Sequence, residues 1–358
     1  MNILVFRVGQ LGDTLAALPA FWAVRSHFKH DSLTLLSDVQ AGKPYVVAQD
    51  LLQGSGLFDA FMTYVYHPSP VMRGWYLARL WAQLHARKFD TLVYLYPSGR
   101  SAEATVRDRR FFQFVGIHRF IGMESNFTAP PKKASQPLPV LPFESDLTLA
   151  RLAGSEIPIP MSGKGRFDLN LGGAEERAVA GWLSSLPQDG GRRWIGVGPG
   201  SKMKAKIWPV ERFRDAVARL IEAHDLWPVV FGSQEDEGVG DDLIRAWQRG
   251  YNAAGHLSLR ASAAALGRCR LYFGNDTGTM HLAASAKTPC AAIFSARDYP
   301  GRWEPCGVPR RVLRSAIECE GCMLTDCVER RMECLMRISV DDAVAACESL
   351  LRECAVMS

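Results

Sequence analysis

The stretch 271–285 constrains the fold of this chain more than any other part of the sequence. A short apolar run is followed by a polar turn and then by small residues in a helical pattern, with Asp276 and Thr277 where a helix N-cap is expected. The stretch therefore predicts a strand, a loop and a helix. Unpaired N–H groups at the start of such a helix favour a bound anion such as phosphate, and Gly278 lets a ligand approach closely. His281, one turn further on, would face the same ligand, although an ordinary capped turn with His281 in the core is the alternative.

The same alternation of strand and helix runs through the whole chain. Apolar runs predict strands at 2–6, 33–36, 60–66, 91–96, 194–197, 227–231 and just before residue 275. Helical patterns predict helices around 75–84, 145–152, 174–186, 210–223, 260–267 and 341–351, with another that ends near residue 249. Strands that alternate with helices indicate an α/β protein with parallel, doubly wound sheets.

Proline content marks where the first half of the chain ends. Five prolines fall between residues 126 and 143, and two more follow at 158 and 160. With 358 residues the chain is long enough for two domains that each bury a core. We therefore predict a first lobe over 1–163, a second lobe over 164–340 and a terminal helical segment over 341–358.

Positive charge is concentrated in one part of the chain. Residues 73–133 hold eleven Lys or Arg against four Asp or Glu, a local excess of seven positive charges, while the whole chain carries +5. Such a segment suits an anionic partner, such as a phosphorylated substrate or a membrane surface, and a solvated basic face is the alternative. Nucleic acid is disfavoured as a partner because no nucleic-acid-binding motif accompanies the charge.

The sequence shows neither a membrane span nor a secretory signal. No apolar run reaches the roughly 18 residues that a bilayer requires, and charged residues and glycines interrupt the first twenty positions. We therefore expect a cytoplasmic protein with reduced thiols. Four of its nine cysteines lie close together, at Cys319, Cys322, Cys327 and Cys334. This spacing allows a tetrahedral zinc site, but only one C-x2-C pair is present, so free thiols are the favoured interpretation.

The loop after the first predicted strand presents a carboxylate. It contains Gly9, Gly12 and Asp13 but matches neither a dinucleotide fingerprint nor a P-loop. Asp13 is either a helix cap or a carboxylate at the carboxyl edge of the strand, which is where open α/β sheets place their active sites.

A second loop, 198–209, suits a diphosphate. Gly200 allows close approach of the backbone, Ser201 offers a hydroxyl and Lys206 offers a cation. Lys202 and Lys204 are either part of the same anion site or solubilising surface charges.

In combination these segments resemble glycosyltransferase family 9, the ADP-heptose:lipopolysaccharide heptosyltransferases. The resemblance rests on Ile3–Asp13 with Leu18 and Pro19, Gly198–Gly200 with Lys206–Pro209, Asn275–His281 with Thr288 and Pro289, and Arg302–Pro305 with the cysteine-rich tail. These motifs span nearly the whole chain in the order of the family, whereas residues 40–140 carry little of the resemblance.

This resemblance implies the GT-B fold, in which two Rossmann-like lobes face a cleft and a terminal helix packs back on the first lobe. It implies inverting transfer without a metal or cofactor, with Asp13 as the general base that deprotonates the acceptor hydroxyl and Lys206 beside the leaving diphosphate. The implied donor-binding residues are Gly200, Ser201, Asp276, Thr277, Gly278 and His281, with Gln234 or Glu235 at the ribose, where many members have a glutamate.

The predicted reaction moves a heptose or related sugar, with ADP-heptose as the expected donor, to a lipopolysaccharide-core or similar anionic acceptor. Contacts with the acceptor are predicted from Arg7, Gly12, Arg73 and Arg100. Peripheral contact with the cytoplasmic face of the inner membrane belongs to the same expectation. The alternatives are a nucleotide-sugar epimerase of the same fold and a nucleotide-sugar-binding protein without activity.

Overall fold

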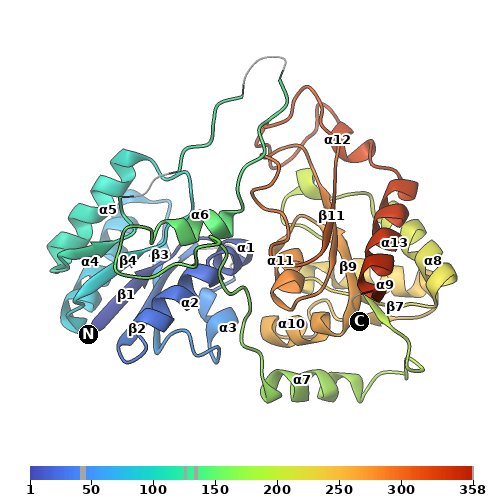
Figure 1. The fold of residues 1–358 in the computed structure, drawn as a ribbon, viewed down its shortest axis with the longest axis horizontal. Helices are drawn as coiled ribbons and strands as arrows, with labels where there is room; N and C mark the ends of the chain where they lie inside the picture. The colour runs from blue at the N-terminus through green and yellow to red at the C-terminus, as the bar shows by residue number, and fades with distance from the viewer. Residues whose placement is uncertain (41–45, 125–126, 133–135, 357–358) are drawn as a thin grey trace. The chain divides into compact units, whose positions relative to one another are not determined.

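The computed structural model describes residues 1–40, 46–124, 127–132 and 136–356 (Figure 1). In it the chain divides into unit 1, Met1–Ala129 with Pro142–Asn170, and unit 2, Pro130–Leu141 with Leu171–Ser358. The predicted boundary after residue 163 therefore lies inside unit 1. The segment Pro130–Leu141 belongs to unit 2, where the N–H of Leu141 donates to the carbonyl of Pro300 at 2.8 Å.

Unit 1 is built on a parallel five-stranded sheet in the order β3-β2-β1-β4-β5. The strands are β1 Asn2–Phe6, β2 Ser32–Gln40, β3 Ala60–Tyr66, β4 Thr91–Tyr94 and β5 Arg119–Ile121. The helices are α1 Leu11–Ala16, α2 Leu18–His27, α3 Ala48–Leu52, α4 Pro70–Arg87, α5 Ala102–Val115 and α6 Glu144–Ala150. Helices α4 and α5 cover one face of the sheet, and α1, α2 and α6 pack together on the other (Figure 1).

Unit 2 is built on a parallel six-stranded sheet in the order β11-β10-β9-β6-β7-β8. The strands are β6 Trp194–Gly198, β7 Trp227–Val230, β8 Tyr251–Asn252, β9 Cys269–Asn275, β10 Cys290–Phe294 and β11 Arg310–Arg314. The helices are α7 Gly173–Leu183, α8 Val210–His224, α9 Glu237–Trp247, α10 Leu259–Gly267, α11 Gly278–Ser285, α12 Glu333–Met336 and α13 Val340–Val356, with short 3-10 turns η1 Lys204–Lys206 and η2 Gln234–Asp236. Helices α7, α10 and α11 lie on one face, and α8, α9 and α13 lie on the other (Figure 1).

The terminal helix α13 packs within unit 2. Its buried side chains, Ala343, Val344, Cys347 and Leu350, recur every three or four residues and join the core that α8 forms with the sheet. This apolar face is buried in unit 2, and the predicted packing of the helix on the first lobe stays a prediction.

Both sheets change their winding direction beside the first strand of the unit. The change falls between β1 and β4 in unit 1 and between β6 and β9 in unit 2. Loops that follow two such strands diverge and leave a crevice, where open α/β proteins bind their ligands. The segments that carry Asp13, Lys206 and Asp276 follow β1, β6 and β9, with Asp13 in the first turn of α1 and Lys206 in η1. The predicted doubly wound parallel sheets are confirmed, and within the described ranges no helix is long and apolar enough to cross a bilayer.

Two phenylalanines on α5 differ sharply in burial and provide a matched test of the unit 1 core. Phe112 is 3% exposed and meets Phe6 edge-on with ring centroids 5.4 Å apart, whereas Phe114 is 75% exposed. We expect Phe112→Ala to lower the free energy of unfolding by about 3–5 kcal/mol. We expect Phe114→Ala to cost less than about 1 kcal/mol. Urea unfolding followed by circular dichroism measures both, and equal shifts of the midpoint would mean that this core is wrongly described.

Candidate active site

The segment after β1 folds so that the side chain of Asp13 lies against the backbone of Gly9 and Gln10. Gly9 has a φ of 116°, and a Cβ at this position would lie 2.5 Å from the Cβ of Asp13, so only glycine fits. Asp13 stands in the first turn of α1, and its Oδ2 accepts the N–H of Gln10 at 3.0 Å. The carboxylate therefore does cap the helix, as the simpler interpretation expected. This cap is a hydrogen bond to Oδ2 of the carboxylate.

The buried guanidinium of Arg7 holds the backbone of this segment in place. Arg7 is 1% exposed and donates to the carbonyl of Leu95 at 2.9 Å and to the carbonyl of Asp13 at 2.5 Å. A charge this deeply buried requires partners, and backbone carbonyls from two loops supply them. The predicted contact of Arg7 with an acceptor is therefore replaced by a positioning contact with the backbone of Asp13.

The surroundings of Asp13 shift its proton affinity. Burial raises the pKa of Asp13 above its ordinary value, with smaller opposing effects from the Arg7 charge and the Gln10 N–H. The negative charges of Glu144 and Asp38 raise the pKa further. A carboxylate with a raised pKa is a stronger base at neutral pH than an exposed one, which suits proton abstraction.

Two carboxylates near Asp13 escaped the sequence analysis. Glu144 is buried at the start of α6, and it accepts hydrogen bonds from the N–H of Ser98, at 2.7 Å, and from the Ser98 hydroxyl. Asp38 accepts the N–H of Gly9 at 2.9 Å. The position of Asp38 near the carboxyl end of β2 is a signal that the sequence offered, whereas Glu144 lies beyond the proline-rich segment and carries no local motif.

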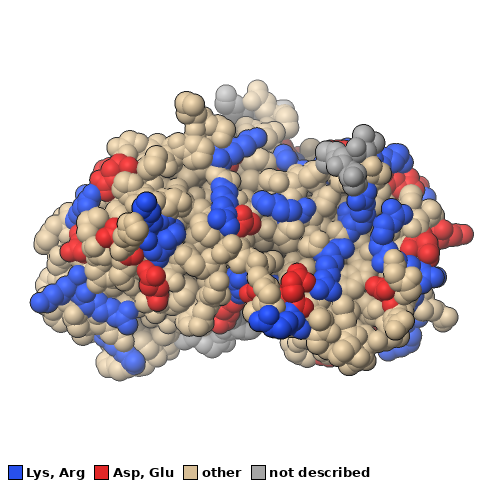
Figure 2. All heavy atoms as spheres, turned by 60° about the horizontal axis from the view of Figure 1, so that its bottom comes forward, with Lys and Arg blue, Asp and Glu red and all other residues tan. Residues whose placement is uncertain are grey.

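The basic segment 73–133 does not form a single charged surface. Arg100 pairs with Asp108 at 2.6 Å and also donates to the Tyr96 hydroxyl at 2.9 Å. Arg109 and Arg119 likewise have carboxylate partners, Lys132 lies in unit 2, and Lys133 lies outside the described residues. On the face in Figure 2, lysine and arginine side chains lie among aspartate and glutamate side chains in both units. Folding therefore pairs part of this charge with carboxylates, and the predicted contact of the segment with an anionic partner stays a prediction.

The other predicted acceptor residues occupy separate places in unit 1. Gly12 lies within α1, directly before Asp13, whereas Arg73 lies in the first turns of α4 and is half-buried. Of the four predicted acceptor residues, only Gly12 and Arg7 therefore lie next to Asp13. The acceptor contacts of Arg73 and Arg100 stay predictions.

In unit 2 an ion pair lies at the point where the sheet changes direction. The ammonium of Lys206 lies 2.7 Å from Oδ2 of Asp276, and both side chains are largely buried. The fully buried Asn275 ties the two loops together, because its Oδ1 accepts the N–H of Trp208 at 3.2 Å and its Nδ2 donates to the carbonyl of Pro199 at 2.7 Å. Two stretches of sequence that were singled out separately therefore form one site.

The N-terminus of α11 opens beside this ion pair. Thr277 is the N-cap in an extended conformation, as predicted, and its own side chain does not cap the first turn, which begins at Gly278. The N–H groups of a first turn and the positive end of the helix dipole favour an anion here.

His281 lies in the same helix and is uncharged at neutral pH. Its pKa is lowered to about 4, chiefly by burial; the negative charge of Asp276 opposes this shift, and the positive charge of Lys206 adds to it. Its ring meets that of Trp303 edge-on at 6.2 Å between centroids. A neutral imidazole can donate one hydrogen bond and accept another, so His281 suits a polar ligand rather than charge neutralisation.

The remaining donor-side predictions lie around the loop after β6. A Cβ at Gly200 would lie 2.0 Å from Oδ1 of Asp236, so the turn η2 packs directly on this glycine. Gln234 in that turn is exposed and donates to Glu237, and Ser201 accepts the N–H of Met203 at 3.2 Å. Gly200, Ser201 and the turn of Gln234 are thus neighbours in unit 2.

The four clustered cysteines are free thiols. Across the described part of the chain, no three His, Cys, Asp or Glu side chains are placed to hold one metal ion. The arrangement of Cys319, Cys322, Cys327 and Cys334 therefore gives the zinc hypothesis no support.

Comparison with known proteins gives consistent similarities. Residues 142–333, more than half of the chain, match glycosyltransferase family 9 (heptosyltransferase). The chain is 30% identical over 131 residues to lipopolysaccharide heptosyltransferase 2 of Escherichia coli strain K12, which is 34% of this chain and 36% of that protein. It is 30% identical over 111 residues to lipooligosaccharide heptosyltransferase 2 of Haemophilus influenzae, covering 29% and 32% of the two chains. The matched region thus spans about a third of these curated relatives.

Solved structures share the fold over nearly the full length. The structure of ADP-heptose lipopolysaccharide heptosyltransferase II of E. coli has a TM-score of 0.69 at 18% identity, covering 99% of this chain and 100% of that one. A family 9 glycosyl transferase from Veillonella parvula has a TM-score of 0.73 at 20% identity, covering 98% and 97%. At such identities the likeness supports the fold, which is that of two-lobed GT-B heptosyltransferases.

The lowered pKa of His281 predicts a loss of stability in acid. The unfolded chain, with an ordinary histidine pKa of 6.5, binds a proton that the folded chain does not bind until the pH falls to about 4. The wild type should therefore lose up to about 3 kcal/mol relative to His281→Gln between these two pH values, and no more below them. Urea unfolding of both proteins across this range measures the difference. A pH-independent difference, or an NMR titration of His281 above pH 6, would show that the imidazole is not buried as described.

Proposed function

Because the chain belongs to glycosyltransferase family 9, we propose that it transfers a heptose from ADP-heptose to a lipopolysaccharide-core or similar anionic glycolipid acceptor. One observation carries the proposal: a polar site lies at the direction change of each sheet, with a carboxylate of raised pKa in unit 1 and a lysine beside a helix N-terminus in unit 2. The identity of sugar and acceptor rests on the names of the relatives, lipopolysaccharide heptosyltransferase 2 and lipooligosaccharide heptosyltransferase 2.

In this proposal Asp13 is the general base. The acceptor hydroxyl attacks the anomeric carbon of the heptose and passes its proton to the carboxylate of Asp13. The bond from that carbon to the diphosphate oxygen breaks, and its electron pair leaves with ADP. Attack opposite the leaving group inverts the anomeric configuration. Arg7 acts as a positioning residue, since its guanidinium fixes the backbone from which Asp13 projects.

The donor diphosphate is proposed to bind at Lys206 and the start of α11. As ADP leaves, negative charge grows on its terminal phosphate, and fixed positive groups that face this oxygen lower the barrier. Asp276, directly before the N-cap of α11, holds the ammonium of Lys206 near the start of this helix. Neutral His281 offers a hydrogen bond to the sugar or phosphate, Ser201 offers its hydroxyl, and Gln234 or Glu235 would contact the ribose.

The same proposal places the protein in the cytoplasm, in peripheral contact with the inner membrane that holds a glycolipid acceptor. Acceptor contacts from Gly12, Arg73 and Arg100 are part of it. The reaction further requires that the acceptor at Asp13 and the donor at Lys206 meet in one complex.

Replacing Asp13 tests its proposed role as the base that deprotonates the acceptor. Asp13→Asn keeps an oxygen for the N–H of Gln10 but cannot take a proton, so kcat for heptose transfer should fall by about 100-fold to 10,000-fold. ADP binding measured by calorimetry should stay at the wild-type level. Asp50→Asn, at an exposed position of α3, is the matched control and should transfer normally. Wild-type kcat in Asp13→Asn would remove Asp13 from this role.

Substitutions at two lysines of the turn η1 test the proposed donor site. Lys206→Ala should lower kcat/KM for ADP-heptose by about 100-fold to 1,000-fold, because a preorganised charge at the leaving group is lost. Lys204→Ala removes an exposed lysine that lies 3.7 Å from Asp326 and should change kcat/KM by less than about twofold. Steady-state kinetics of both variants gives the comparison, and equal effects would mean that Lys206 has no specific place in the site.

A further inference from the structure

Helix α4 turns apolar side chains toward solvent. Of its 18 residues only Leu80 and Leu84 are buried, and both face the sheet. The opposite side is formed by residues at helical spacing, Val71, Trp75, Ala78 and Ala82, all exposed. Val71 is 83% exposed and Trp75 is 54% exposed. We call these four residues the α4 stripe. An apolar stripe on the outside of a helix indicates a surface that binds something.

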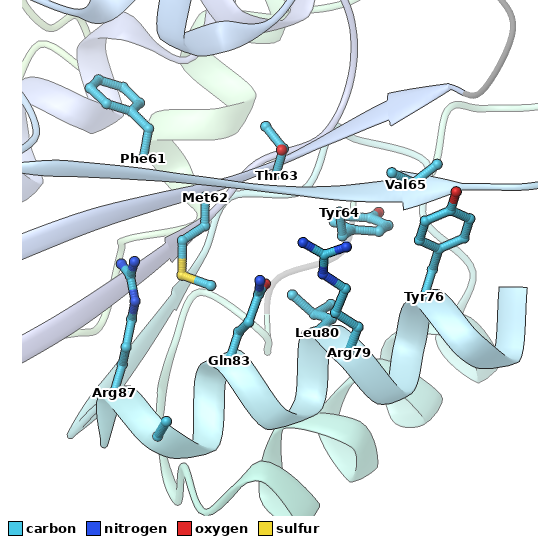
Figure 3. A pocket seen from close by; sticks show the side chains of 11 residues that line it. Phe61, Met62, Thr63, Tyr64, Val65, Tyr76, Arg79, Leu80, Gln83 and Arg87 are labelled. Carbon is cyan, nitrogen blue, oxygen red and sulfur yellow. The ribbon is translucent and has the colours of Figure 1, made fainter.

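A groove runs along the flank of this stripe. It lies between α4 and β3, the edge strand of the unit 1 sheet, and has a volume of about 570 Å³. Arg79, Gln83 and Arg87 follow one another at four-residue intervals and point from α4 toward β3, with Tyr76 at one end (Figure 3). The groove therefore presents two guanidinium groups, an amide and a phenol beside an apolar surface.

The charge of α4 has one sign. The helix contains Arg73, Arg79 and Arg87 but no Asp or Glu. None of the three arginines forms an ion pair with a carboxylate of the described chain, and the guanidinium of Arg79 lies 5.8 Å from the centre of the Trp75 ring. The stripe is thus bordered by unneutralised positive charge.

Helix α5 extends this surface. Its exposed Phe114 packs against Trp81 of α4 at 5.6 Å between ring centroids, and the Trp81 indole N–H donates to the carbonyl of Phe114 at 3.2 Å. Arg107 and Arg110 lie exposed on α5. Apolar, aromatic and basic side chains therefore continue from one helix to the next.

We propose that the α4 stripe and its groove bind a membrane surface that contains anionic phospholipids. Tryptophan, tyrosine and arginine flanking an apolar helix face suit the boundary between headgroups and acyl chains, where the helix lies in the plane of the membrane. The stripe enters this boundary, and Arg79 and Arg87 bind headgroup phosphates from the groove. A second copy of the chain fits less well, because a symmetric contact through this face would bring like charges together. The inference rests on the proposed membrane contact, which it deepens by naming the surface, and does not depend on the sugar transferred.

Flotation of the full-length protein with lipid vesicles tests the inference. We expect wild-type protein to bind vesicles of phosphatidylcholine with phosphatidylglycerol, to bind pure phosphatidylcholine vesicles weakly, and to dissociate as salt is raised. Arg79→Gln with Arg87→Gln should lower the partition coefficient about 30-fold. Trp75→Ser should lower it about tenfold through loss of apolar contact. The matched control, Val239→Ser with Arg245→Gln on exposed positions of α9, should bind as the wild type does.

The outcomes separate this inference from the transfer reaction. All variants should unfold at the wild-type temperature and transfer heptose normally to a delipidated, water-soluble acceptor, since their altered side chains lie outside the proposed active site. The inference would be overturned if the wild-type protein did not bind vesicles that contain anionic lipid. It would also be overturned if the Arg79 and Arg87 double variant and Trp75→Ser bound these vesicles as tightly as the wild type. Either result would leave the transferase proposal intact. Self-association through the α4 stripe in sedimentation, without vesicle binding, would equally overturn it.

Discussion

Charge buried at the carboxyl ends of parallel strands is stable only when it has partners, and this requirement shapes both units. In unit 1 the guanidinium of Arg7 is held by backbone carbonyls and in turn fixes the loop of Asp13. In unit 2 the ammonium of Lys206 is held by Asp276, while Asn275 joins their two loops. Neither group can move far without leaving a buried charge unpaired, which costs several kcal/mol. Each charged group is therefore held by partners within the protein, and charge that is preorganised in this way favours catalysis.

Within each unit, the sheet topology explains why residues that are far apart in the sequence contact one another at the site. Winding in both directions from β1 and from β6 creates a crevice beside each strand, and the loops that follow neighbouring strands meet there. In unit 2 this brings Lys206 after β6 to Asp276 after β9. The surrounding core has a different role, because apolar side chains such as Trp208 and Phe213 only hold the sheet and its helices in register.

The sequence was sufficient to predict most of the fold but only part of the site. Apolar runs located β1 and β3 to the residue. β1 is buried and continuously apolar after Asn2, as is typical of a parallel strand, whereas β3 is an edge strand in which Thr63 and Tyr66 are exposed. Arg7 was predicted to contact the acceptor, since nothing local in the sequence reveals that its guanidinium will donate to the carbonyl of Leu95. Likewise, the sequence alone does not show which cations of the basic segment have carboxylate partners, as Arg119 has in the distant Glu156.

The central claim is that these two buried sites serve glycosyl transfer between two substrates. The most direct measurement is product analysis, by mass spectrometry and nucleotide assay, after incubation of the purified protein with ADP-heptose and a lipopolysaccharide core that lacks heptose. The account predicts that ADP is released and one heptose is added to each acceptor, and that neither occurs when the acceptor is omitted. Conversion of ADP-heptose in the absence of acceptor, or donor binding without any product when both substrates are present, would contradict it.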